Sequence, residues 1–359
     1  MALNDNRVQF IDVAKGISIC LVAMFHSQLL HLIPQIIVPM GLFRMPLFFF
    51  LSGVFFSFKP TPGVFFLKKA EALLKPYFAV LLTVMVVTLL TETTTKSWSQ
   101  LLIGLFYGVG NTLQWVPLWF LPHLFALYGF GYLICRYTPF TKLPVLLRYS
   151  VLMLMLVMGT VTVDLFWERE VTWLDYPNPL PGLPFSIDLL FITSVYFLLG
   201  ALLRNSIIHF TPNFIALSLA FLVLVLIICY TDATINLNRR EYLDPVFATF
   251  GALCGIYTVL SIAWGMGKIH WLRKSFSIIG SASLFILIFH NWIGENLYKL
   301  LASDQPDSVY NFVLGLFTLL LSISVPILIK WVVAQSNFLS LFFFPVRSNH
   351  WFQLQQKMS

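Results

Sequence analysis

The chain has 359 residues, of which 58% are hydrophobic and only 10% are charged, and its formal net charge is +7. Soluble chains carry roughly 45–50% apolar and about 25% charged residues, so this composition excludes a water-soluble globular protein. The basic residues are spread over the segments between apolar runs, and this distribution argues against a nucleic-acid partner.

Apolar runs near the roughly 20 residues needed to cross a bilayer recur along the whole chain. They predict an all-α, polytopic integral membrane protein of about ten transmembrane helices. The predicted helices cover residues 10–32, 41–58, 76–92, 117–136, 144–163, 187–204, 212–231, 245–266, 277–299 and 309–333. A further apolar stretch, Trp98–Val109, is short and contains glycine, which favours an interfacial or re-entrant segment. The predicted domains are a transmembrane domain over residues 1–333 and a short cytoplasmic tail over 334–359.

Lysine and arginine side chains concentrate in alternate loops of this arrangement. The positive-inside rule then predicts that both termini are cytoplasmic. Most acidic residues fall on the opposite side, around a proline-rich loop that ends with residues 177–184 and is the longest predicted outer loop. One interpretation of this loop is a solvated connector, and the other is a segment that covers a site or binds an acceptor.

The cysteines predict no metal site. They stand singly along the chain, with no C-x-x-C pair and no histidine at a ligand spacing; they are Cys20, Cys135, Cys229 and Cys254. Packing within the membrane is the role that this distribution indicates.

The first predicted helix carries polar residues that a purely structural span would not need. Lys15 and His26 are eleven residues apart, which places them within about 20° of each other on one helix face and roughly 16 Å apart in depth. Asp12 lies three residues before Lys15 and can pair with its ammonium group. The predicted stripe has Lys15 and Asp12 at its cytoplasmic end and His26 in the outer half of the membrane.

Three residues of other predicted spans fall at depths compatible with His26. Arg44 lies within about one turn of the outer surface, His123 about 9 Å below it, and His290 roughly 20 Å from the cytoplasmic end. Together they predict a cavity with a reaction zone in the outer half of the membrane. Each has a structural alternative. Arg44 can extend to lipid head groups and His123 can cap a helix end, while His290 can pack on the helix face that it shares with Ser283.

Acyl transfer is the chemistry that fits these residue types. The neutral imidazole of His26 is suited to general base catalysis, in which it takes a proton from a sugar hydroxyl that attacks a thioester. The oxyanion that forms needs a donor, which Arg44 or a hydroxyl of Ser52 or Ser283 would supply. Lys15, at the inner mouth, would attract the phosphates of a cytoplasmic acyl donor.

The opening segment, Arg7–Ser27, resembles the first helix of the membrane-bound acyltransferase family 3, in which ten residues separate a basic residue from a histidine, here Lys15 and His26. Residues Phe43–Gly53 are similar to the second signature of that family. The matching positions are Arg44, Pro46, Phe48, Phe49, Ser52 and Gly53. The chain departs from the family pattern in having lysine in place of arginine at the first basic position. It also has no counterpart of the paired arginines that some members carry in the third span.

Two shorter segments extend the resemblance: Leu118–Leu121, which contains Trp119, and Ser283–His290. The resemblance implies transfer of an acyl group, most often acetyl from acetyl-CoA, to a hydroxyl of a cell-surface carbohydrate such as lipopolysaccharide O-antigen. It implies a bacterial inner-membrane enzyme whose partners are acyl-CoA, the carbohydrate acceptor and membrane lipids. The candidate residues are then His26, Arg44 and His290 for catalysis, Lys15 and Asp12 for donor binding, and Ser52, Trp119, His123 and Ser283 for support.

A different class of function uses the same polar stripe as the lining of a path, in a transporter or flippase of a lipid-linked sugar. Transporters frequently show internal repeats or paired broken helices, and the sequence shows no obvious pair. A third hypothesis is a non-catalytic assembly role, in which apolar replacement of the polar residues would be tolerated. Movement of an acceptor across vesicles without acylation would indicate the transporter.

Overall fold

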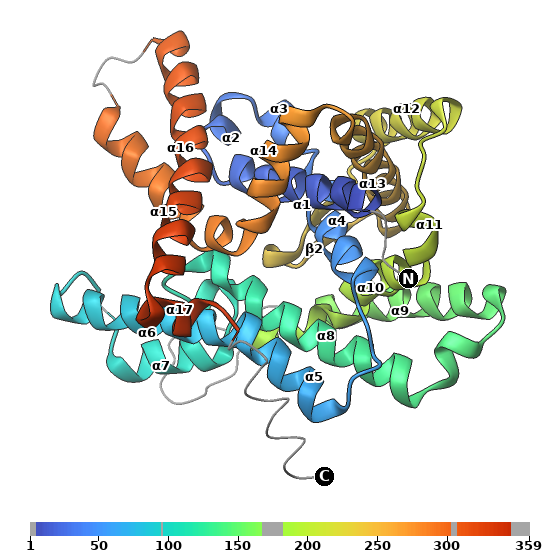
Figure 1. The fold of residues 1–359 in the computed structure, drawn as a ribbon, viewed down its shortest axis with the longest axis horizontal. Helices are drawn as coiled ribbons and strands as arrows, with labels where there is room; N and C mark the ends of the chain where they lie inside the picture. The colour runs from blue at the N-terminus through green and yellow to red at the C-terminus, as the bar shows by residue number, and fades with distance from the viewer. Residues whose placement is uncertain (1–4, 95, 167–181, 303–306, 346–359) are drawn as a thin grey trace.

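The computed structural model describes residues 5–94, 96–166, 182–302 and 307–345 (Figure 1). Its α-helices are α1 Asp5–Phe25, α2 Leu29–Leu32, α3 Pro34–Ile37, α4 Gly41–Val54, α5 Pro62–Lys69, α6 Lys75–Leu90, α7 Trp98–Tyr107, α8 Phe120–Tyr137, α9 Val145–Phe166, α10 Leu190–Leu202, α11 Arg204–Ile208, α12 Phe214–Tyr230, α13 Pro245–Gly267, α14 His270–Ser281, α15 Ser283–Leu301, α16 Ser308–Gln335 and α17 Asn337–Phe343. An antiparallel hairpin joins α12 to α13, with strands β1 (Thr234–Asn236) and β2 (Glu241–Leu243). The all-α prediction is confirmed, with this short hairpin added.

Six of the described helical segments are long and apolar enough to cross a membrane: Pro62–Leu90, Val116–Tyr137, Val145–Phe166, Pro184–Leu202, Pro245–Gly267 and Ser308–Gln335. A seventh results if α14 and α15, which meet at an angle of 81°, form one broken span. Helices α4 and α12 are apolar but shorter. The structure therefore agrees with the membrane class, whereas the count of ten spans is not confirmed and the side on which the termini lie stays a prediction.

Two predicted spans differ from the observed helices. The prediction of one helix over residues 10–32 is wrong at its end, because α1 stops at Phe25 and the chain turns through α2 and α3. At this end, the Ser27 hydroxyl donates to the carbonyl of Met24 (2.7 Å). The prediction of one helix over 277–299 is also wrong, because the chain bends sharply between α14 and α15. Glycine and serine stand at this bend, where kinks concentrate.

The predicted tail is folded as far as it is described. Helix α16 extends to Gln335, and α17 follows it. Phe343 stacks on Phe285 of α15 with ring centroids 5.3 Å apart, and the Lys75 ammonium donates to the carbonyl of Phe344 (2.6 Å). This part of the segment 334–359 therefore packs against the helical domain.

The apolar stretch that predicts an interfacial segment forms the ten-residue helix α7. Ser97 and Gln100 cap its first turn reciprocally, and Gly108 ends it in the left-handed conformation, with φ of 69°. Its position relative to a bilayer stays a prediction. Most of the predicted proline-rich outer loop falls on residues 167–181, which lie outside the described part of the chain.

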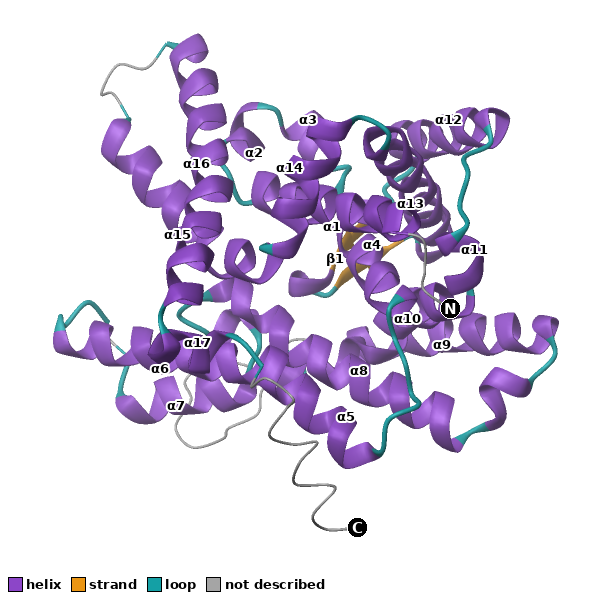
Figure 2. Cartoon of the chain, in the orientation of Figure 1, coloured by secondary structure: helices purple, strands orange, loops and turns teal. Residues whose placement is uncertain are grey.

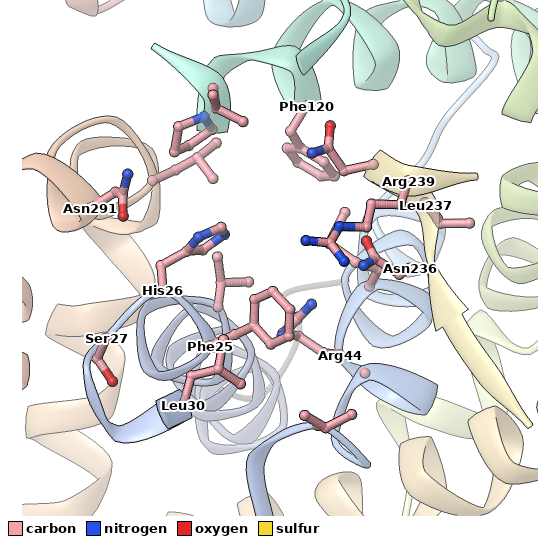
Figure 3. A pocket seen from close by; sticks show the side chains of 18 of the residues that line it. Phe25, His26, Ser27, Leu30, Arg44, Phe120, Asn236, Leu237, Arg239 and Asn291 are labelled. Carbon is pink, nitrogen blue, oxygen red and sulfur yellow. The ribbon is translucent and has the colours of Figure 1, made fainter. Parts of the chain in front are cut away.

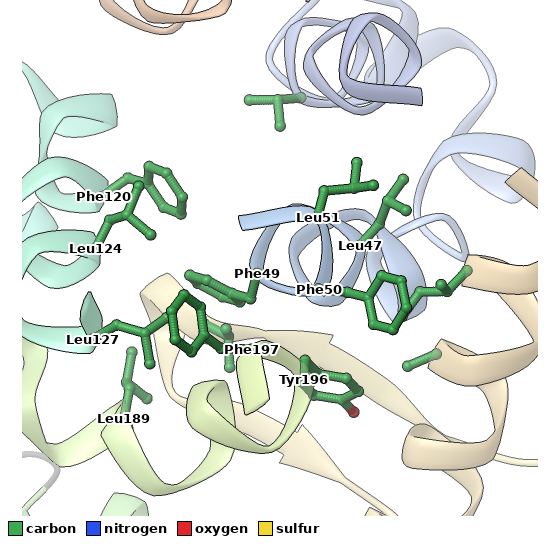
Figure 4. Packing of buried hydrophobic residues seen from close by; sticks show 14 of the residues in the cluster. Leu47, Phe49, Phe50, Leu51, Phe120, Leu124, Leu127, Leu189, Tyr196 and Phe197 are labelled. Atoms are coloured by element: carbon green, nitrogen blue, oxygen red, sulfur yellow. The ribbon is translucent and has the colours of Figure 1, made fainter. Parts of the chain in front are cut away.

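The packing of α4 on α10 lies within the hydrophobic core (Figure 4). Phe50 and Phe197 are buried there, and two glycines let the helix backbones meet. A Cβ added to Gly53 would overlap the carbonyl oxygen of Phe197, and one added to Gly200 would overlap that of Phe50. Small residues favour such close approach of helices in membranes. We call this contact between Gly53 and Gly200 and the facing carbonyls the glycine seam.

Replacing Gly53 by alanine is expected to lower the free energy of unfolding by about 1–3 kcal/mol, the usual cost of overpacking a tight contact. Thermal unfolding in one detergent measures the loss. The matched control is Gly63→Ala in α5, where an added Cβ would meet no atom within 4 Å. This control should lose no stability, because alanine has the higher helix propensity. Equal losses of stability in the two variants would argue against the close contact at the glycine seam as the cause.

The helices surround the hairpin. Helices α15 and α16 stand together at one side of the molecule and α12 and α13 at the other, with α1 and α4 between them (Figure 1). The two strands lie near the middle of the fold (Figure 2). This arrangement brings the polar residues of the hairpin to the region where α1 ends and α4 begins.

Candidate active site

The end of α1 opens onto a cavity of about 750 Å³ (Figure 3). His26 follows the last residue of α1, and its amide N–H still contacts the carbonyls of Val22 (3.4 Å) and Ala23 (3.2 Å). The residue therefore continues the helical turn and keeps its place on the predicted stripe. Its side chain is exposed and lines the cavity, into which the imidazole points.

The cavity wall is mixed in character. It is formed by the end of α1 and the turns after it, the first half of α4, residues 116–120 at and before the start of α8, the β1–β2 hairpin, α15 and one residue of α16. Aromatic lining residues are Phe25, Phe48, Trp119 and Phe120, and polar ones include His26, Arg44, Asn236, Arg239, Glu241, Asn291 and Glu295. An apolar cleft with a few convergent polar groups is the usual form of a small-molecule site.

His290, on α15, lies beside His26 with its ring centroid 5.2 Å from that of His26. Its Nδ1 is 2.7 Å from the carbonyl oxygen of Ile286, so Nδ1 carries the proton and donates it. The other nitrogen, Nε2, is buried and has no hydrogen-bond partner. A buried imidazole with a fixed tautomer and an unused lone pair is more than a packing residue requires.

Arg44, in the first turns of α4, also carries an unused polar atom. Its side chain is only 5% exposed, and the guanidinium carbon lies 3.6 Å from the ring centroid of Phe25. One terminal nitrogen is buried without a hydrogen-bond partner, and no described carboxylate lies within ion-pair distance. The burial argues against the alternative in which Arg44 extends to lipid head groups. Its guanidinium is instead held at the cavity by a cation–π contact.

The hairpin forms a polar wall of the cavity that the sequence predictions missed. Asn236, Arg239 and Glu241 bring polar side chains to the cavity, and the apolar residues Ile235 and Leu237, which also line it, are almost fully buried. The available signal was a dense polar run, from Asn236 to Glu241, in a chain with only 10% charged residues. This wall provides amide, guanidinium and carboxylate groups to a bound molecule.

A buried ion pair anchors the hairpin. Arg240 donates from Nε to Asp188 (3.0 Å) and from a terminal nitrogen to the Ser186 hydroxyl (3.1 Å). Both charged side chains are fully buried. Tyr242 provides a second anchor, because its hydroxyl lies 2.7 Å from that of Tyr196. Burial raises the pKa of Tyr242, so the phenol stays neutral and able to donate.

Lys15 and Asp12 do not line the cavity. They form the predicted pair, with the ammonium 3.1 Å from the carboxylate, and their side chains are 35% and 41% exposed. The Lys15 ammonium also lies 4.0 Å from the ring centroid of Phe55. The pair is therefore available to a ligand near the middle of α1, about three turns before His26.

The four predicted supporting residues are separated by the structure. Trp119 lines the cavity, whereas His123 is fully buried outside its wall. The two ring nitrogens of His123 are each 3.1 Å from a partner, the Ser186 carbonyl and the Thr193 hydroxyl. Ser52 and Ser283 are partly buried and do not belong to the cavity wall. Only Trp119 of this group is thus placed to touch a molecule in the cavity.

Comparison with known families gives one match. A family model described as an acyltransferase domain, of acyltransferase family 3, matches residues 8–331. Neither a curated protein nor a solved structure gives a significant match. Within the described residues, no group of three or more histidine, cysteine, aspartate or glutamate side chains is arranged to hold a metal ion.

Proposed function

The chain belongs to acyltransferase family 3, whose model matches it from residue 8 to residue 331, and from this membership we propose that it moves an acetyl group from cytoplasmic acetyl-CoA to a hydroxyl of a cell-surface carbohydrate. It is an integral membrane acyltransferase. A bacterial inner membrane and an acceptor such as lipopolysaccharide O-antigen complete the proposal.

One observation carries the proposal. The accessible imidazole of His26 shares a cavity with the Arg44 guanidinium, and His290 lies against it, each of these two neighbours with a buried nitrogen that lacks a partner. Buried polar groups are usually satisfied, and exceptions concentrate at functional sites. Acyl transfer from a thioester would use a base for the hydroxyl proton, here His26, and a donor for the oxyanion, here Arg44.

In this proposal, the His26 imidazole takes the proton of the acceptor hydroxyl as its oxygen attacks the thioester carbonyl carbon. The carbonyl oxygen becomes an oxyanion, to which Arg44 donates. The carbon–sulfur bond then breaks, and the departing thiolate receives the proton from His26. His290 is assigned a positioning role, because its free Nε2 can accept a hydrogen bond from the protonated ring of His26.

Donor entry is assigned to the Lys15–Asp12 pair, about three turns before His26 on α1. Lys15 and the lysines near α5 and α6 would attract the donor phosphates on the cytoplasmic side, and Asp12 would keep the Lys15 ammonium in position. About 16 Å of helix separates Lys15 from His26. The reactive arm of the donor, or the acyl group alone, must span this distance.

The test uses the purified full-length chain in vesicles with radiolabelled acetyl-CoA and a glycan extract from cells that lack the gene. We expect the label to appear on the glycan in a one-to-one ratio with released thiol. A donor series with longer acyl groups identifies the preferred acyl chain. If the glycan crosses the vesicle membrane and gains no label, the transporter hypothesis replaces this one.

A further inference from the structure

Besides Arg44, the cavity wall contains a second cation, Arg239, which faces His26 from the hairpin. Arg239 is exposed, lines the cavity and points into it from the turn between β1 and β2 (Figure 3). Asn236 and Glu241, on either side of the turn, line the same wall. The hairpin therefore presents three side chains that recognise polar ligands to the space in front of His26.

Among the described residues, Arg239 has no carboxylate within ion-pair distance. Of the two carboxylates in the cavity wall, Glu295 is already paired with Lys299 (2.6 Å), which leaves Glu241. Arg44 adds a second guanidinium without a carboxylate. The charges that are not neutralised by neighbours are thus two cations and one anion, and this excess favours a negatively charged ligand.

The hairpin holds Arg239 in a defined place. Its neighbour Arg240 is fixed by the buried carboxylate of Asp188, and Tyr242 of β2 is fixed by the hydroxyls of Tyr196 and Thr249. The backbone of Ile235 packs near Gly41 at the start of α4. The anchored hairpin fixes the point from which the Arg239 side chain extends, and this lowers part of the entropic cost of binding.

The position of Arg239 favours the acceptor over the donor. In the proposed function the donor phosphates lie near Lys15, roughly 16 Å along α1 from His26. Arg239 instead belongs to the wall that adjoins His26. A guanidinium at this place suits a carboxylate or a phosphate, which it can bind through two hydrogen bonds.

We propose that Arg239 binds an anionic group of the acceptor, a carboxylate of an acidic sugar or a phosphate of its lipid carrier, and that the β1–β2 hairpin is the acceptor-binding wall. This inference rests on the proposed function and narrows its acceptor to glycans that carry a negative charge on a sugar or on the lipid carrier. Asn236 and Glu241 then contact sugar hydroxyls, and the Asp188–Arg240 pair positions the wall.

The experiment compares Arg239→Ala with Arg136→Ala, a matched removal of an exposed arginine at the end of α8, outside the cavity. Both are assayed in vesicles with acetyl-CoA and the glycan extract. Losing a charge-assisted bond should raise the acceptor KM of Arg239→Ala roughly tenfold to a hundredfold. The KM for acetyl-CoA should stay close to that of the wild type. Arg136→Ala should match the wild type in both constants.

Two treatments of the extract identify the anion for the wild-type protein. Reduction of carboxyl groups should raise the acceptor KM if an acidic sugar is bound, and mild acid release from the lipid phosphate should raise it if the carrier is bound. In Arg239→Ala, the treatment that raises the acceptor KM of the wild type should raise the acceptor KM little further. An unchanged acceptor KM in Arg239→Ala, or a rise confined to acetyl-CoA, would overturn the inference.

Equilibrium binding of the extract, measured without acetyl-CoA, separates this inference from the proposed function. Binding that weakens in Arg239→Ala while the wild type transfers no label would sink the proposed function and keep the acceptor site. Transfer that is the same in Arg239→Ala and the wild type would overturn this inference and leave the proposed function standing. A lower melting temperature in Arg239→Ala alone would reveal misfolding, in which case Arg239→Lys, which keeps the charge and loses the fork, is measured and should show an intermediate acceptor KM.

Discussion

Acyl transfer to the glycan is expected to fall by about two to four orders of magnitude when His26 is replaced by alanine, because a positioned general base contributes a factor of that size. The loss should appear in kcat, since the imidazole acts on the proton that moves in the transition state. Steady-state transfer of radiolabelled acetyl, with saturating donor and acceptor, measures it.

The matched control is His209→Ala. His209 is exposed outside this cavity, and its ring bonds the carbonyl of Asn205 one turn earlier (2.9 Å). Its replacement should leave transfer intact. Added imidazole should restore part of the activity of His26→Ala, an effect that a merely structural histidine would not give. Transfer close to that of the wild type in His26→Ala would remove His26 from the mechanism.

The second large effect concerns stability. Asp188→Leu is expected to lower the free energy of unfolding by about 3–5 kcal/mol, because it leaves the fully buried guanidinium of Arg240 without its carboxylate. The bonds of Arg240 to Ser186 and to the Asn238 carbonyl remain, so the loss should lie nearer the lower figure. Thermal unfolding in one detergent, followed by circular dichroism, provides the comparison.

Two further variants test the origin of this loss. Lys299→Met breaks an exposed ion pair, whose side chains are 68% and 48% exposed, and should change stability by less than about 1 kcal/mol. The double variant Asp188→Leu with Arg240→Met removes both buried charges and should recover part of the stability. A double variant no more stable than Asp188→Leu would contradict an electrostatic cause.

Helical geometry was enough to predict which residues of α1 share a stripe. Membrane spans restrict depth, and a period of 3.6 residues fixes the face, so Arg44 and His290 were expected at the level of His26. The structure places His290 against the ring of His26 and Arg44 in the wall of the cavity that His26 lines. Their chemical roles stay predictions. Depth alone could not place His123, because periodicity does not tell which neighbouring helix a face meets.

The hairpin and the bend between α14 and α15 were not predicted, for two physical reasons. Strand β1 has three residues and one apolar position, Ile235, and Leu237 already lies in the turn, so the alternating pattern is too short to indicate a strand. Adjacent arginines after them resemble solvated loop charges, and only the three-dimensional fold shows that Arg240 turns inward while Arg239 faces the cavity. Hydropathy likewise averages over a sharp bend made of small residues.

The glycine seam has a consequence for motion. Backbone meets backbone where Gly53 and Gly200 face carbonyl oxygens, so no side-chain rotamer is free to yield, and α4 and α10 must move as a single rigid body. Arg44 therefore keeps its position relative to α10, whereas Asn291 and Glu295 enter the cavity wall from α15, a helix outside this contact.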